Sequence, residues 1–238
     1  MGLIIGSFLN VIIYRIPGGE LVVWPGSYCV ACGRRLKALD LIPVLSYILL
    51  RGRCRYCSER ISIRYPLVEI LTAVLFLLVY CNFGWTVHSL VGVIFTSVLI
   101  VVSFTDIEKG IIPDSITYPA VITGLCLSIF TIGPKDSIVA MLVFGGMFLL
   151  IAIVSKGGMG GGDIKLAMVI GAFVGLQGIF LVFIISSLLG GLWVILLLMQ
   201  GKAERNTALK FGPFLAVAGW SAWMYNPVIM AFYLGLFF

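Results

Sequence analysis

The chain has 238 residues, of which 61% are hydrophobic and only 11% are charged, and its mean hydropathy is +1.15. About a quarter of the residues in a soluble domain are charged, so this composition excludes an ordinary soluble globular protein. It predicts an all-α polytopic membrane protein, whose spans are recognised by their length and apolar character.

Apolar segments close to the roughly 20 residues that a spanning helix needs recur along the chain. The first is short and is followed by Arg15, but it lacks the basic start and the small closing residues of a signal peptide, so we expect a true span. About eight transmembrane helices are predicted, over Met1–Tyr14, Pro66–Phe83, Val87–Thr105, Ser115–Ile132, Asp136–Ser155, Ile164–Leu176, Gly178–Met199 and Gly212–Phe238.

Lys and Arg residues sort to one side of these spans. Cytoplasmic loops collect such residues during insertion, so we expect a cell-membrane protein in lipid with both chain termini outside. Only Lys135 then falls outside, and topology explains the net charge of +6 without a nucleic-acid partner. The inner set is Arg15, Arg34, Arg35, Lys37, Arg51, Arg53, Arg55, Arg60, Arg64, Lys109, Lys156, Lys165, Lys202, Arg205 and Lys210.

The spans divide the chain into three parts. Residues 1–15 are the first transmembrane helix, residues 16–65 a cytoplasmic loop domain, and residues 66–238 a core of seven helices. Two C-x2-C pairs lie in the loop domain. Such turns aim four sulfurs at one point and predict a tetrahedral cage for structural Zn²⁺, formed by Cys29, Cys32, Cys54 and Cys57.

Other uses of these thiols remain as alternatives. Iron is the usual competitor for four thiolates, and two disulfides are the other choice, which a reducing cytoplasm disfavours. Cys81 and Cys126 lie in apolar spans and are interpreted as packing residues.

Two acids also receive structural interpretations. Glu69 falls in the first turn of the second span, where the helix dipole favours an anion, and Asp136 sits on the outer side beside Lys135.

Three aspartates at the inner membrane face invite a functional hypothesis, because ionisable groups at that depth are costly. Asp114 follows Pro113 and is typical of a helix N-cap. Asp163 opens the sixth span after the glycine run 157–162 and could also cap its helix, with Lys165 as a nearby counter-ion, but a simple cap does not call for a glycine run in front of it. Asp106 ends the third span, where the dipole disfavours an anion, so capping of its own helix does not explain it.

Asp106 and Asp163 could form a dyad that shares one proton, with one carboxylate activating a water and the other polarising a peptide carbonyl. The glycines, including Gly160 and Gly162, would let backbone approach a substrate closely. His88 is the single histidine and lies on the outer side, which argues against a histidine-based triad on the inner side. The glycine run does not complete a nucleotide-binding loop, because Asp163 occupies the lysine position.

Five stretches together resemble the bacterial type IV prepilin peptidases: "GSFLNVIIYRIP", the two cysteine pairs, "RYPLVE", "DIEKGIIPD" and "GGGDIKL". The likeness covers nearly the whole chain. It implies an intramembrane aspartyl protease of the G-x-G-D type, with eight spans and a zinc-binding loop. By this resemblance Asp106 and Asp163 are catalytic, and Asp114, Gly160, Gly162 and Lys165 have supporting roles.

The resemblance also implies the substrate and a second activity. A prepilin or pseudopilin with a short basic leader would be cut after a glycine at the cytoplasmic face, and the new N-terminus would be methylated from S-adenosylmethionine. No residue indicates the methyl-donor pocket or the oligomeric state. A proton-coupled transporter that uses the same two aspartates is the alternative from another class, and a non-enzymatic scaffold that docks a partner through the zinc module is a third.

Overall fold

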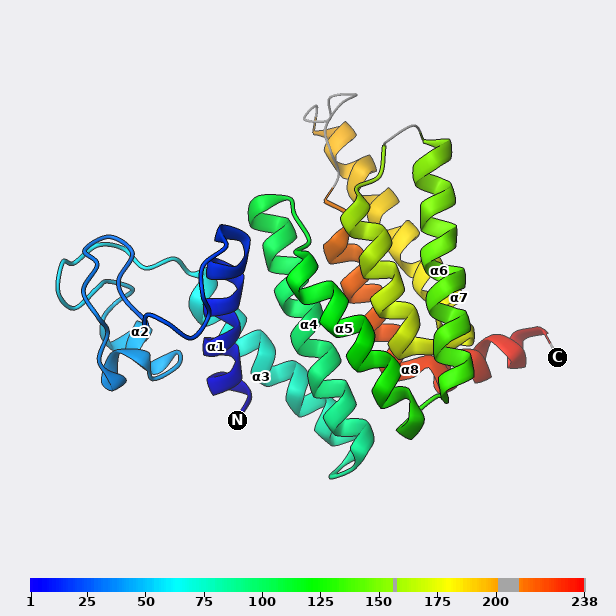
Figure 1. Ribbon diagram of the computed structural model, residues 1–238, viewed down its shortest axis with the longest axis horizontal. Coiled ribbons are helices and arrows are strands. Elements are labelled where there is room, and N and C mark those ends of the chain that lie inside the picture. Colours follow the sequence, from blue (N-terminus) through cyan, green and yellow to red (C-terminus); the bar gives the residue numbers. More distant parts are fainter. Residues whose placement is uncertain (156–157, 201–209, 238) are drawn as a thin grey trace. The chain divides into compact units, whose positions relative to one another are not determined.

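A computed structural model describes residues 1–155, 158–200 and 210–237, with side chains as far as Tyr225 (Figure 1). Lys156, Gly157, Lys202, Arg205 and Phe238, which entered the expectations above, lie outside the described residues. The described part consists of helices joined by loops, with two isolated bridges as its β-structure. This confirms the all-α class.

The helices follow the predicted spans closely. Ile164–Leu176 and Gly178–Met199 are the two parts of one broken helix, and α2 is a single turn within the loop. The bounds are α1 (Gly2–Arg15), α2 (Leu45–Leu49), α3 (Arg64–Phe83), α4 (Val87–Lys109), α5 (Asp114–Leu127), α6 (Pro134–Val154), α7 (Gly161–Met199) and α8 (Gly212–Phe237). Among the described residues, α3, α4, α6 and α7 are long and apolar enough to cross a membrane, while α1 and α5 are shorter apolar helices.

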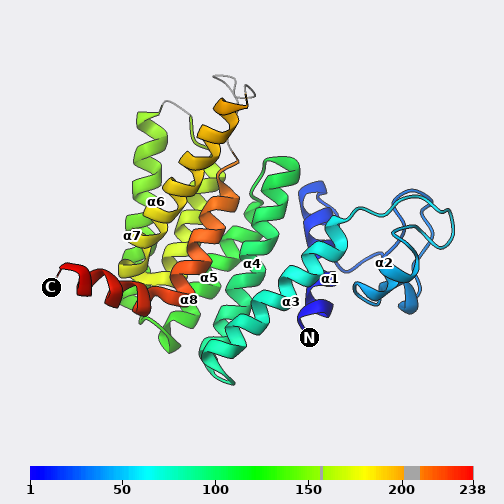
Figure 2. The ribbon, with the colours of Figure 1, turned by 180° about the vertical axis from the view of Figure 1, so that it is seen from behind.

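The first of two compact units covers Met1–Trp85 and contains α1, the cysteine loop and α3. Helices α1 and α3 lie side by side in both ribbon views (Figures 1 and 2). A Cβ on Gly6 would lie only 2.7 Å from the Cα of Glu69, so glycine is what permits this close approach. Glu69 lies in the second turn of α3 and is buried, so the prediction of a first-turn site at the helix dipole was wrong.

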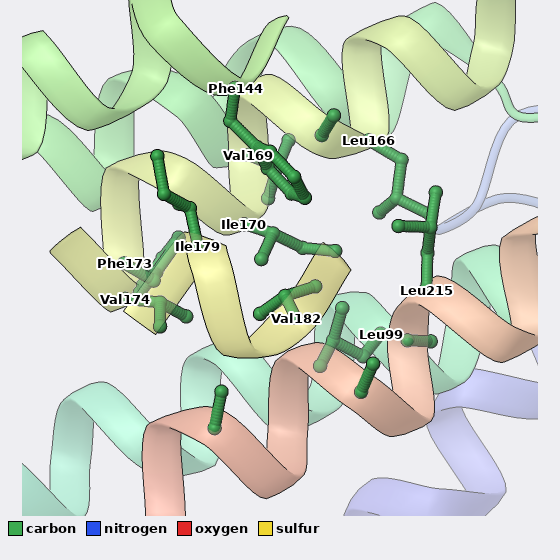
Figure 3. Packing of buried hydrophobic residues seen from close by; sticks show 14 of the residues in the cluster. Leu99, Phe144, Leu166, Val169, Ile170, Phe173, Val174, Ile179, Val182 and Leu215 are labelled. Carbon is green, nitrogen blue, oxygen red and sulfur yellow. The ribbon is translucent and has the colours of Figure 1, made fainter. Parts of the chain in front are cut away.

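The second unit covers Thr86–Phe238 and is built around α7. Figure 3 shows side chains of several helices meeting in its core, among them Leu99 of α4, Phe144 of α6, Ile170 of α7 and Leu215 of α8. Many large apolar side chains face outward instead. In lipid such helices associate through close van der Waals packing rather than through exclusion of water.

Helix α7 breaks at Gly175, whose φ of 78° and ψ of 175° are essentially restricted to glycine. The break leaves backbone groups of both halves without helical partners. The start of α6 satisfies them: Asp136 accepts from the N–H of Leu176 at 3.3 Å, and the Ser137 hydroxyl donates to the carbonyl of Ala172 at 2.7 Å. Asp136 therefore has a structural role that its position beside Lys135 did not indicate.

Candidate active site

Asp106 lies in the last turn of α4 and is only 6% exposed. Its Oδ2 accepts a hydrogen bond from the backbone N–H of Gly212 at 3.1 Å, and Gly212 is the first residue of α8. A Cβ at position 212 would lie 2.7 Å from that same oxygen, so a glycine is needed there. The positive end of the α8 dipole thus stabilises a carboxylate that α4 itself disfavours.

Asp163 lies in the first turn of α7, three residues after the N-cap Gly160, and is 8% exposed. The backbone N–H of Gly160 hydrogen-bonds its carboxylate, which is one half of a capping box. Gly160 has ordinary extended dihedrals, and a Cβ there would make only a normal contact with Asp163. At Gly162, by contrast, a Cβ would lie 2.9 Å from the Cβ of Ile112, so this glycine lets α7 begin close to the loop between α4 and α5.

The fold brings Asp106 and Asp163 within electrostatic range of each other, since the charge of Asp106 acts on Asp163. They come from opposite ends of two helices, the end of α4 and the start of α7. Two carboxylates that act on each other in this way disfavour the state in which both are ionised, because like charges repel.

Lys165 pairs with Asp114 rather than with Asp163. Its Nζ donates to Oδ1 of Asp114 and lies 5.4 Å from the ring centroid of Tyr118. Asp114 is the first residue of α5, where the dipole favours an acid, and Pro113 is the N-cap, so the expected capping role of Asp114 was wrong. The half-exposed ion pair joins the start of α5 to the start of α7.

Two residues near Asp106 were not predicted from the sequence to belong to the site. Gly212 is recognisable there only as the first residue of an apolar segment, and Lys210 only as one of the cations that indicate topology. The Nζ of Lys210 donates to the carbonyl of Ile107 at 2.6 Å, and its charge acts on Asp106. A cation at the C-terminus of α4 offsets the partial negative charge of that helix end next to a buried acid.

The four predicted metal ligands meet in the cysteine loop of the first unit. The Sγ atoms of Cys29, Cys32, Cys54 and Cys57 all lie within 4.8 Å of one another, and those of Cys29 and Cys57 are 3.9 Å apart. Tetrahedral Zn–S bonds of about 2.3 Å require sulfurs about 3.8 Å apart. Antiparallel bridges Tyr28↔Arg35 and Arg53↔Arg60 flank the two pairs. All six cysteines are free thiols.

The pKa values of two of these thiols also favour a bound metal ion. Backbone N–H groups of Tyr56 and Cys57 lower the pKa of Cys54 to about 7. The N–H of Glu59 acts in the same direction on Cys57, but burial and hydrogen bonds with the other three thiols outweigh it and raise the pKa of Cys57 to about 12. A second thiolate is therefore disfavoured unless a cation shares its charge, as a bound zinc ion would.

Asp40, which lies between the two cysteine pairs in sequence, stabilises this loop through three hydrogen bonds. It accepts hydrogen bonds from Arg55 Nε at 2.6 Å, from the hydroxyl of Tyr56 at 3.1 Å and from the N–H of Lys37 at 3.1 Å. Burial opposes ionisation of this carboxyl, but these three donors outweigh it and hold the pKa of Asp40 below its usual value. The second cysteine pair is thereby tied to the segment that follows the first.

Two family models match the chain. The model described as "Bacterial Peptidase A24 N-terminal domain" matches residues 1–83, and "Type IV leader peptidase family" matches residues 93–195. The boundary between them falls close to the boundary between the two compact units. No solved structure gives a significant match.

Curated relatives match over nearly their whole length. A Pseudomonas putida protein is 36% identical over 260 residues, which cover 97% of this chain and 90% of the relative. A Neisseria gonorrhoeae protein is 36% identical over 262 residues, which cover 96% of this chain and 90% of the relative. A Bacillus subtilis (strain 168) protein is 36% identical over 237 residues, which cover 98% of this chain and 95% of the relative. All three are named prepilin leader peptidase/N-methyltransferase.

Proposed function

Because the chain belongs to the type IV leader peptidase family, we propose that it is a membrane-embedded enzyme that removes the leader of prepilins or pseudopilins and then methylates the new N-terminus. The resemblance found in the sequence is thereby confirmed at the level of the family. Membership of this family and the apolar helices together make it a protein of the cell membrane.

We assign peptide hydrolysis to Asp106 and Asp163. The observation that carries this assignment is the burial of both carboxylates within electrostatic range of each other. The ionised member of the pair takes a proton from a water molecule, and the water oxygen attacks the scissile carbonyl. The protonated member donates a hydrogen bond to the carbonyl oxygen and later supplies the proton that the leaving amine requires.

Neighbouring groups support this assignment. The N–H of Gly212 and the N–H of Gly160 each hold one of the two carboxylates from a helix start, so both side chains are fixed by backbone. Such orientation reduces the reorganisation needed in the transition state. The Lys165–Asp114 pair links the start of α5 to the start of α7 and gives those two residues a positioning role.

The active site is proposed to face the cytoplasm, with both chain termini outside. The distribution of Lys and Arg supports this orientation. A basic leader that remains in the cytoplasm would then meet the two aspartates at the inner face, with cleavage after a glycine. The thiol cluster is proposed to hold a structural zinc ion, since all four ligand positions come from protein.

The test is co-expression with a candidate prepilin, followed by mass analysis of the prepilin N-terminus. Asp106→Asn and Asp163→Asn are each expected to lower cleavage by about 10²-fold or more while the protein still inserts. Glu108→Gln is the matched control, because Glu108 is an exposed acid two residues from Asp106, and it should cleave normally. A proton-coupled transporter predicts unchanged processing in both aspartate variants, and that result would refute the peptidase assignment.

A further inference from the structure

Large apolar side chains lie on the outside of the cysteine loop, in the segment between the two cysteine pairs. They are between 39% and 72% exposed, and three of them belong to the short helix α2. Exposed apolar side chains that gather in one place mark a contact with a protein or with a membrane. The apolar surface of the loop, as it is called below, consists of Leu39, Ile42, Leu45, Ile48 and Leu49.

The other side of α2 faces the interior of the first unit. Ser46 and Tyr47 line the cavity of the first unit, as does Leu50, the residue that follows the helix. The hydroxyl of Tyr47 also donates to the carbonyl of Ile61 at 3.4 Å. One side of this segment is therefore held by protein, while the apolar surface is turned away from it.

A hydrogen bond fixes the height of this segment along α3. The N–H of Val44, the N-cap of α2, donates to Oε2 of Glu69 at 2.7 Å. Glu69 stands five positions after Arg64, the first residue of α3, which is about 7.5 Å along the helix axis. Helix α3 has 20 residues and is apolar enough to cross a membrane, and such a helix spans about the whole hydrocarbon core. The segment thus lies level with a spanning helix and not beyond its end.

This height is that of the membrane interface. The headgroups add about 5–7 Å to each side of the hydrocarbon core, and segments that lie in the interface bury their apolar side about 5–10 Å deep. The position of Val44 falls within this range. Leu67 and Ile70, on either side of Glu69 in α3, are also exposed apolar residues, so α3 itself presents a lipid-facing surface at the same level.

The charges around the apolar surface favour lipid as its partner. Residues 34–55 contain six Lys or Arg residues and one acid, Asp40, whose carboxylate is paired with an arginine. Lys37 precedes most of the apolar surface, Arg51 and Arg53 follow it, and all three are exposed. Cations beside apolar side chains are typical of segments that bind anionic lipid. A second copy of this loop is a poor partner, because two equally basic surfaces repel each other.

We propose that the apolar surface of the loop enters the headgroup region of the adjacent leaflet, and that Lys37, Arg51 and Arg53 bind anionic phospholipid headgroups there. The cysteine loop is then held against the membrane by its own surface as well as by α1 and α3. This inference goes beyond the proposed function and does not depend on which reaction the two aspartates catalyse.

Photochemical labelling tests the contact in the full-length protein, in nanodiscs of phosphatidylglycerol and phosphatidylcholine in equal amounts. The photoreactive residue p-azidophenylalanine replaces Ile48 in one variant and Tyr47 in the other, and mass analysis after illumination identifies the attached molecule. We expect lipid on position 48 and cross-links within the first unit from position 47, which faces the cavity. Position 49, the next outward residue, repeats the test if the substitution at 48 disturbs folding.

Charge variants test the chemistry of the lipid. Labelling from position 48 is expected to favour phosphatidylglycerol over phosphatidylcholine, and Arg51→Gln and Arg53→Gln should each lower this preference by about fivefold. Lys135→Gln is the matched control, because Lys135 is an exposed cation of the second unit, and it should leave the preference unchanged. The midpoint of thermal unfolding should stay near that of the wild type in all three variants.

Three results would overturn the inference. Cross-links from position 48 to a second copy of the chain would make the apolar surface a contact between protomers. Absence of lipid adducts at both 48 and 49 would mean that the surface faces water. Equal labelling of the two lipids, unchanged by Arg51→Gln, would exclude anionic headgroups as the ligand. Prepilin cleavage, measured on the same samples, reports the proposed peptidase separately.

Discussion

The backbone N–H of Gly212 and the carboxylate of Asp106 are joined by a 3.1 Å hydrogen bond across 106 positions of sequence. The acid lies at the end of α4 and the donor at the start of α8, so one helix stabilises the charge that the other disfavours. Lys210, two residues before the donor, binds the carbonyl of Ile107 and holds the two helix ends together.

Gly212→Ala is expected to displace the Asp106 carboxylate, because the new Cβ would lie 2.7 Å from Oδ2. A displacement of about 1 Å at a catalytic group can cost about 10²-fold in rate. We therefore expect a loss of prepilin cleavage of that order with little change in protein level on a gel. Gly146→Ala in α6, where a Cβ meets nothing within 4 Å, is the control, and an equal loss in both variants would contradict this account.

Gly162→Ala and Gly161→Ala separate a close contact from general flexibility in the glycine run. A Cβ at 162 would lie 2.9 Å from the Cβ of Ile112, whereas a Cβ at 161 meets nothing within 4 Å. Overpacking of this kind costs about 1–3 kcal/mol, so Gly162→Ala should lower both cleavage and the midpoint of thermal unfolding. Gly161→Ala should change neither by much. Equal defects would mean that the run acts through its flexibility.

Gly175→Ala tests the break in α7. Alanine is strained at φ 78° and ψ 175°, and its Cβ would meet the carboxylate of Asp136 that accepts from Leu176. The expected cost is about 1–3 kcal/mol for the backbone alone. Thermal unfolding in detergent, followed by circular dichroism, measures it. Gly191→Ala, in open space of the same helix, should be neutral or slightly stabilising, because alanine has the higher helix propensity.

Cys54→Ser should remove bound zinc, because a tetrahedral site loses most of its affinity with one of four thiolates. Elemental analysis of the wild type is expected to give about one zinc per chain. Cys81→Ser and Cys126→Ser are matched controls, since these free thiols lie in α3 and α5 outside the cluster, and both should keep the metal. Zinc in the Cys54→Ser protein at the wild-type level would rule out the cluster as the site.

The fold class, the spans and the candidate metal ligands could all be predicted from the order of the residues alone. Spans are readable because the hydrocarbon core demands apolar segments of a fixed length, and α4 and α7 match their predicted positions closely. The four cysteines of the candidate metal site could be recognised because two C-x2-C turns are local in sequence and carry their own geometry. The break in α7 was anticipated as two separate spans.

Which side chains and backbone groups contact one another became apparent only from the packing of the helices. Three such contacts join different helices. Lys165 pairs with Asp114, the N–H of Gly212 donates to Asp106, and Asp136 accepts a hydrogen bond at the break in α7. Local rules place a charge at the start or end of its own helix, so they left Asp106 without an explanation and did not predict the partner of Asp114. Which helix end lies beside which acid depends on how helices pack in lipid, where shape and close approach rather than apolar periodicity select the neighbours.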